Sequence, residues 1–144
     1  MNPIKKPTSN EHVKVILSSL WLFAVLNYLY CDVMTHMDPD ALKQILTGSV
    51  GSIHITQGFL LQASFFMEIP IAMVLFSRIL KYQVARWASI VAGTIMTAGQ
   101  IASLFVGTEP TLYYIFFSTI EISCTVFIVV YAWRRPMLRE STPN

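Results

Sequence analysis

Hydrophobic positions along this 144-residue chain fall into four long runs separated by polar segments. The runs cover residues 13–34, 55–76, 86–106 and 112–133. A helix of about 20 apolar residues crosses a bilayer core of roughly 30 Å, and each run has that length. The pattern therefore predicts an all-α integral membrane four-helix bundle. Residues 13–134 form its transmembrane domain, between tails of residues 1–12 and 135–144.

The segment between the first two runs predicts a short amphipathic helix over residues 39–47. Asp38 stands at the N-cap position, Pro39 opens the first turn, and Gly48 follows the end. An apolar residue recurs on one side of the helix, at Leu42 and again at Ile45. We expect this helix to lie on the membrane surface or to cover one end of the bundle.

Charged residues make up 12% of the chain, against roughly a quarter in soluble domains. With the N-terminus inside, nine of the ten basic residues lie on the cytoplasmic side of the four predicted spans, and only Lys43 lies outside. Loops rich in Lys and Arg stay in the cytoplasm. The distribution therefore predicts that both termini are cytoplasmic and that the 39–47 helix is on the outer side.

Two carboxyls, Glu68 and Glu121, fall near the middle of the second and fourth runs. A charge at that depth costs several kcal/mol or more, so each must face protein or water or be neutral. Lipid offers polar groups no partner. We therefore expect the polar side chains of the spans to face one another around a cavity that opens outward above the two carboxyls. The residues predicted to bind a ligand there are Glu68, Glu121, Gln100, Asn27, Gln57, Ser64 and Tyr114.

Three interpretations of the two carboxyls remain open. They bind or pass a small cationic or amphiphilic molecule, or protons. Alternatively they act as acid and base on a lipid-soluble substrate, because burial and like charge would separate their pKa values. In the third interpretation the chain is a structural or accessory subunit, and the carboxyls only fix helix packing through hydrogen bonds. The first is our leading hypothesis, and it makes the chain a non-enzymatic protein.

Other chemistry finds little support in the sequence. Cys31 and Cys124 lie at different predicted depths and form no metal or redox motif. Asp32 and His36, near His54 on the outer loop, match no metal-site spacing. No histidine lies within a predicted span, so a bis-histidyl haem is not expected. We therefore predict no catalytic residue, metal site or cofactor, and the absence of a basic and aromatic patch predicts no nucleic-acid partner.

The third run, residues 86–106, is rich in Gly, Ala, Ser and Thr. Small residues let helices approach closely in lipid. We expect the chain to form a homodimer through this run, with the lipid bilayer as its surroundings.

Several segments carry a resemblance to known proteins. The segments are 19–23, 27–32, 56–60, 67–73 (Met-Glu-Ile-Pro-Ile-Ala-Met) and 111–117. They resemble an uncharacterised family of small bacterial four-helix membrane proteins over roughly residues 12–134. The chain is more distantly similar to the DoxX-like proteins. In architecture it is similar to the sterol-isomerase and sigma-2-receptor group, which holds amphiphilic ligands over buried carboxylates. The resemblance implies the bacterial cytoplasmic (inner) membrane as location and brings no catalytic residue.

Overall fold

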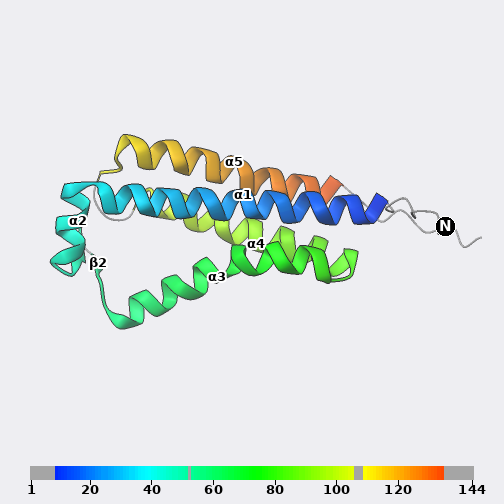
Figure 1. The fold of residues 1–144 in the computed structure, drawn as a ribbon, viewed down its shortest axis with the longest axis horizontal. Coiled ribbons are helices and arrows are strands. Elements are labelled where there is room, and N and C mark those ends of the chain that lie inside the picture. The colour runs from blue at the N-terminus through cyan, green and yellow to red at the C-terminus, as the bar shows by residue number, and fades with distance from the viewer. Residues whose placement is uncertain (1–8, 52, 106–108, 135–144) are drawn as a thin grey trace, which may run out of the picture.

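The computed structural model describes residues 9–51, 53–105 and 109–134. They form five helices and one hairpin of very short strands (Figure 1). In chain order the elements are α1 (Ser9–Met37), α2 (Pro39–Leu46), β1 (Ser49–Val50), β2 (Ile53–His54), α3 (Gln57–Ile79), α4 (Tyr82–Ser103) and α5 (Leu112–Arg134). The all-helical class predicted from the sequence is confirmed. Most of the two predicted tails lies outside the described residues, as does Val106 at the end of the third predicted span.

Within the described residues, three helices are long and apolar enough to cross a membrane, namely α1, α3 and α5. The fourth long helix, α4, does not meet that measure because small and polar residues dilute its apolar ones. Its 22 residues extend over about 33 Å at 1.5 Å per residue. α4 is thus as long as a span, but its composition alone does not make it one.

The four long helices lie side by side, with α1 packed against α3 and α5, and α4 packed against α5 and α3 (Figure 1). One end carries α2 and the hairpin, and we call it the cap end. The other end carries the turn at Leu80 and Lys81, which joins α3 to α4, and we call it the turn end. The first residues of α1 and the last residues of α5 also lie at the turn end.

At the cap end, α2 begins with the N-cap that the sequence indicates. The backbone N–H of Asp40 donates to the Asp38 carboxylate at 3.0 Å, and Pro39 stands in the first turn. β1 and β2 then pair antiparallel, which the sequence analysis did not predict. Gly48 and Gly51 make these turns with φ of 78° and 57°, a region that favours glycine.

Helix α3 bends near its middle, and its cap-end half diverges from the other helices (Figure 1). Pro70 lies inside the helix and has no N–H to donate to the carbonyl of Phe66, which kinks a helix at that point. Only 11% of the most apolar window of α3 is buried, compared with 33% for α1 and for α5. α3 is therefore the least covered of the three apolar helices.

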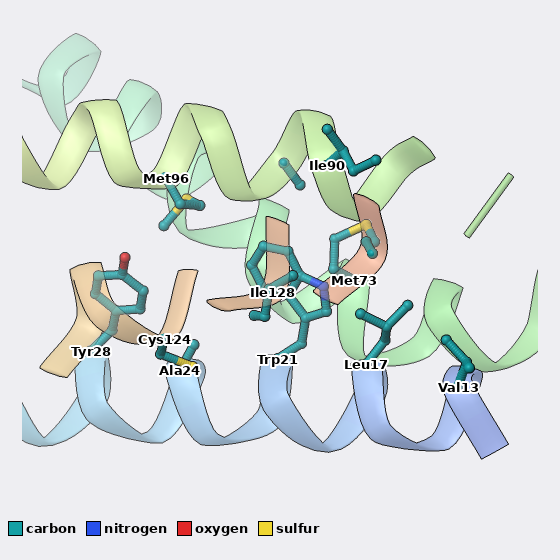
Figure 2. Close-up of a cluster of buried hydrophobic side chains, with 12 residues drawn as sticks. Val13, Leu17, Trp21, Ala24, Tyr28, Met73, Ile90, Met96, Cys124 and Ile128 are labelled. Carbon is teal, nitrogen blue, oxygen red and sulfur yellow. The ribbon is translucent and has the colours of Figure 1, made fainter. Parts of the chain in front are cut away.

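The core lies in the turn-end half and along α1 (Figure 2). Trp21 is fully buried at its centre, and its indole N–H donates to Ser89 of α4 at 3.3 Å. Met73 of α3 and Ile128 of α5 pack around it. Large apolar side chains are exposed around this core on every long helix.

Helices α4 and α5 approach closely at Gly93. A Cβ there would lie 2.7 Å from a methyl of Val129 and 3.3 Å from the backbone oxygen of Thr125. Farther toward the cap end, the ring of Phe66 from α3 occupies the space above Gly99. The two glycines of α4, which the sequence analysis assigned to contacts with a second copy, therefore serve packing within this chain.

Candidate functional site

Glu121 of α5 is buried between helices, with a side chain that is 1% exposed. Neither of its carboxyl oxygens has a hydrogen-bond partner among the described residues. Buried polar groups are nearly always hydrogen-bonded, because an unpaired one loses its interactions with water and gains none. A buried carboxyl without a hydrogen-bond partner is an exception to this rule, and a functional role can explain it.

Helix α1 brings two further polar groups to Glu121. Tyr28 points from α1 toward α4, and within the described parts of the chain its buried hydroxyl also has no hydrogen-bond partner (Figure 2). Both Tyr28 and Asp32 lie close enough to Glu121 to interact with it electrostatically. Asp32 follows Tyr28 by four residues, one turn nearer the cap end. Glu121 therefore shares its surroundings with a phenol and a second carboxyl.

A line of hydrogen bonds begins at Ser118, one turn from Glu121, and leads toward the cap end. Gln100 of α4 donates from its amide to the hydroxyl of Ser118 at 2.9 Å, one turn from Glu121. The hydroxyl of Ser103 donates to the backbone oxygen of Gln100 at 2.7 Å, and Tyr114 donates to Ser103 at 2.7 Å. These contacts place a continuous polar strip along the interface of α4 and α5.

A pocket of about 210 Å³ lies at the cap end of this strip. Its volume is below the roughly 300–1,000 Å³ of pockets for drug-sized ligands, so it suits a small molecule. Tyr114 and Ser103 belong both to its wall and to the hydrogen-bonded strip. α2 and the hairpin close the far side. The remaining wall residues are Thr35, Ala41, Gln44, Ile45, Val50, Ile53, Glu109, Pro110, Thr111 and Tyr113.

The charges around this pocket are mainly negative. Glu109 lines it, and the hydroxyl of Tyr113, another wall residue, donates to the Asp38 carboxylate at 3.3 Å. Asp32, an exposed residue of α1 three positions before the wall residue Thr35, adds another carboxyl at this end of the molecule. The wall itself mixes these groups with aliphatic side chains such as Ile45 and Ile53. This arrangement favours a cation that carries an apolar portion.

The structure does not bring Glu68 to Glu121, contrary to the sequence analysis. Pro70 is fully buried against the core, and two residues along a helix are about 160° apart around its axis. Glu68 therefore points away from the core and is exposed. The acidic group near Glu121 is Asp32 instead. The polar stripe that we expected to line the cavity exists on α3, but it lies on the outer face.

Of the other predicted residues, some are brought to Glu121 and some are not. Gln57 and Ser64 share the outer face of α3 with Glu68, and Ser64 donates to the carbonyl of Leu60 within its own helix. Asn27 of α1 likewise donates to the carbonyl of Phe23 at 2.8 Å. Among the seven predicted residues, the structure gathers only Glu121, Gln100 and Tyr114.

Comparison with known proteins gives one result. A family model described as a family of unknown function (DUF6326) matches residues 5–139, which is most of the chain. The chain belongs to this family. No match was found among curated proteins or among solved structures. The family fits the uncharacterised group that the sequence resembles, and its description names no ligand or reaction.

Four residues of this site, Tyr28, Asp32, Ser103 and Ser118, are not among the seven predicted to bind a ligand. The signal for Tyr28 and Asp32 was their four-residue spacing on one face of α1. Ser118 stands three residues before Glu121, and Ser103 three after Gln100, so each shares a helix face with a predicted residue. In the described parts of the chain, no three His, Cys, Asp or Glu side chains are grouped to hold a metal.

Proposed function

We propose that this protein is a four-span membrane protein that binds or passes a small cation with an apolar portion, or protons, at Glu121. The observation that carries the proposal is the buried Glu121 carboxyl, whose oxygens have no hydrogen-bond partner among the described residues. It lies at the inner end of a polar strip that begins in the acidic cap-end pocket. A protonated amine or a proton would supply the interaction that the carboxyl lacks.

The topology supports four spans. If α3 and α5 cross the membrane, the chain leaves α3 at the turn end and enters α5 at the cap end, so α4 must return across it. The polar side chains of α4 do not oppose this. Thr94 and Thr97 donate to carbonyls of their own helix, and Gln100 bonds within the interface. Polar groups satisfied in this way are compatible with hydrocarbon.

The charge distribution supports the orientation with the cap end outside. Among the described basic residues of the long helices and of the α3–α4 turn, all lie near the turn end, whereas most acidic residues lie near the cap end. By the positive-inside rule the turn end is cytoplasmic, and so are both termini. The bacterial inner membrane and the distant relation to DoxX-like proteins remain predictions from the resemblance.

The packing alternative has less support than binding, and the acid–base alternative needs a second carboxyl other than Glu68. A carboxyl that only fixes helix packing needs hydrogen bonds across the interface, and Glu121 makes none among the described residues. An acid and base acting on one substrate must both reach it, so Glu68, on a different face from Glu121, does not complete such a pair. Asp32 is an exposed carboxyl whose charge acts on Glu121, and we assign it the place of Glu68 beside Glu121.

The test is thermal stabilisation of the purified protein in lipid nanodiscs by a series of alkylammonium ions, from methylammonium upward. A ligand at about 100 times its Kd stabilises a protein by roughly 2.7 kcal/mol. We expect such a gain for wild type and for Glu68→Gln, and none for Glu121→Gln. Equal stabilisation of Glu121→Gln and wild type would refute the site. So would the absence of both ammonium binding and proton uptake by wild type.

A further inference from the structure

The outer face of α3 carries a regular pattern that the packing of this chain does not use. Its residues alternate at intervals of four and three, which is the a/d spacing of helices that pair over an extended length. Each of them is exposed in the structure. We call this set the α3 seam: Gln57, Leu61, Ser64, Glu68, Ile71 and Leu75.

The seam lies opposite the face by which α3 joins the other helices. The core-facing residues Phe66, Pro70, Met73 and Ser77 occupy the positions of the same repeat that point away from a paired helix. Pairing through the seam would therefore leave the internal contacts of the chain undisturbed. The divergence of the cap-end half of α3 from the other helices also leaves that half accessible (Figure 1).

Glu68 is the main reason to expect that another helix covers the seam. It lies at the middle of an apolar helix, on the face turned away from the protein. A carboxyl at that depth facing hydrocarbon costs several kcal/mol. Gln57 adds a polar group at the start of the helix on the same side, while Ser64 already donates to the carbonyl of Leu60. A membrane protein avoids this cost by covering such a stripe with another helix.

We propose that the α3 seam is covered by the α3 seam of a second copy of this chain. Two copies inserted in the same direction are related by a twofold axis along the membrane normal, so each seam residue meets its own counterpart. A carboxamide, a hydroxyl and a protonated carboxyl each donate and accept hydrogen bonds. Gln57 is thus complementary to its counterpart, and two Glu68 carboxyls are complementary when they share a proton, while Leu61 and Ile71 supply apolar contact.

None of the seam residues is basic, so the arrangement brings no two basic seam side chains together. Arg78 would follow Leu75 in the repeat, but its guanidinium turns back to donate to the hydroxyl of Ser18 on α1 at 3.4 Å. The interface differs from the one expected from the small residues of α4, since Gly93 and Gly99 are covered by side chains of this chain. The inference requires that α3 crosses the membrane, and it does not depend on what Glu121 binds.

Cysteine cross-linking of the full chain in bilayers tests the interface. Leu61→Cys and Ile71→Cys place thiols in the seam, where paired Cβ atoms come within the roughly 4 Å that a disulfide spans. Phe76→Cys, on a neighbouring exposed face of α3, and Val126→Cys, on the exposed face of α5, are matched controls. Wild type, with buried Cys31 and Cys124, gives the background. We expect on the order of tenfold more disulfide dimer from the seam variants than from the controls.

Substitution of Glu68 provides the second measurement. Glu68→Gln keeps a group that pairs with itself, and we expect its dimer affinity to stay near that of wild type. Glu68→Leu removes the hydrogen bonds and should weaken dimerisation by roughly 3- to 30-fold. Because Glu68 is exposed, both variants should fold, which the melting temperature of the monomer in detergent verifies. A monomer in bilayers, or cross-linking stronger at Val126→Cys than in the seam, would overturn the proposal.

Discussion

The side-chain amide of Gln100 donates a 2.9 Å hydrogen bond to the hydroxyl of Ser118, and this contact joins α4 to α5 one turn from Glu121. Both side chains are buried. Each of the two groups thus finds its hydrogen-bond partner within the chain. The same interface leaves the carboxyl of Glu121 without such a bond. That contrast distinguishes the part of the polar strip that holds the helices together from the part that we assign to binding.

The Gln100–Ser118 bond should contribute measurably to stability. Ser118→Ala leaves the amide unpaired, and we expect the free energy of unfolding to fall by roughly 0.6–2 kcal/mol, as for other interhelical hydrogen bonds. The measurement is a double-mutant cycle with Gln100→Leu in a reversible unfolding assay. A coupling energy below about 0.3 kcal/mol, within the usual additivity error, would contradict the assignment.

Replacement of Glu121 should not destabilise the protein. Exchange of a buried ionisable group for a well-packed apolar one is often neutral, or stabilising by about 1–4 kcal/mol. We therefore expect Glu121→Leu and Glu121→Gln to unfold at or above the wild-type melting temperature in the absence of ligand. If the carboxyl only fixed helix packing through hydrogen bonds, Glu121→Leu would be clearly less stable than Glu121→Gln. Comparing the two variants therefore separates a structural role from a binding role.

Gly93 should be intolerant of any side chain. A methyl group there overlaps Val129 and crowds the backbone oxygen of Thr125, so Gly93→Ala must separate α4 from α5. We expect a loss of about 1–3 kcal/mol, typical of overpacked sites. Gly58→Ala, whose nearest new contact is at 3.9 Å, is the control and should be neutral or slightly stabilising. Equal melting temperatures for the two variants would show that the close approach does not exist.

Pro70 should set the divergence of α3. Pro70→Ala restores an N–H that can bond to the carbonyl of Phe66, which straightens the helix. Spin labels at Phe59 and Leu29, both exposed, should then report a shorter distance between the cap-end halves of α3 and α1. Labels at Leu75 and Leu22, in the turn-end halves, should show no change. An unchanged cap-end distance would mean that Pro70 does not cause the bend.

Much of the fold follows from local features of the sequence. Apolar runs predict the long helices, and Asp38 with Pro39 predicts the start of α2, because these signals depend on neighbours along the chain. The hairpin was not predicted, since strands of two residues carry almost no periodicity. α4 contains many small and polar residues. It is therefore more easily recognised as a helix than as a membrane-spanning segment.

The candidate site was only partly predictable, because the sequence does not state which face of a helix is buried. Gln100, Tyr114 and Glu121 lie on faces that pack, whereas the equally periodic stripe of Glu68 does not. The sequence alone predicts that every polar stripe faces the interior of one chain. The buried Pro70, two residues after Glu68, fixes the opposite orientation. A stripe excluded from lipid can instead face a second copy.

The most direct test of the account asks whether Glu121 itself responds to a ligand. Infrared difference spectroscopy of the protein in nanodiscs, with and without an alkylammonium ion that stabilises it, reports the carboxyl C=O stretch of a side chain that changes protonation or hydrogen bonding. We predict a difference band in wild type and in Glu68→Gln that is absent from Glu121→Gln. A band that persists in Glu121→Gln, or that disappears in Glu68→Gln, would contradict the account.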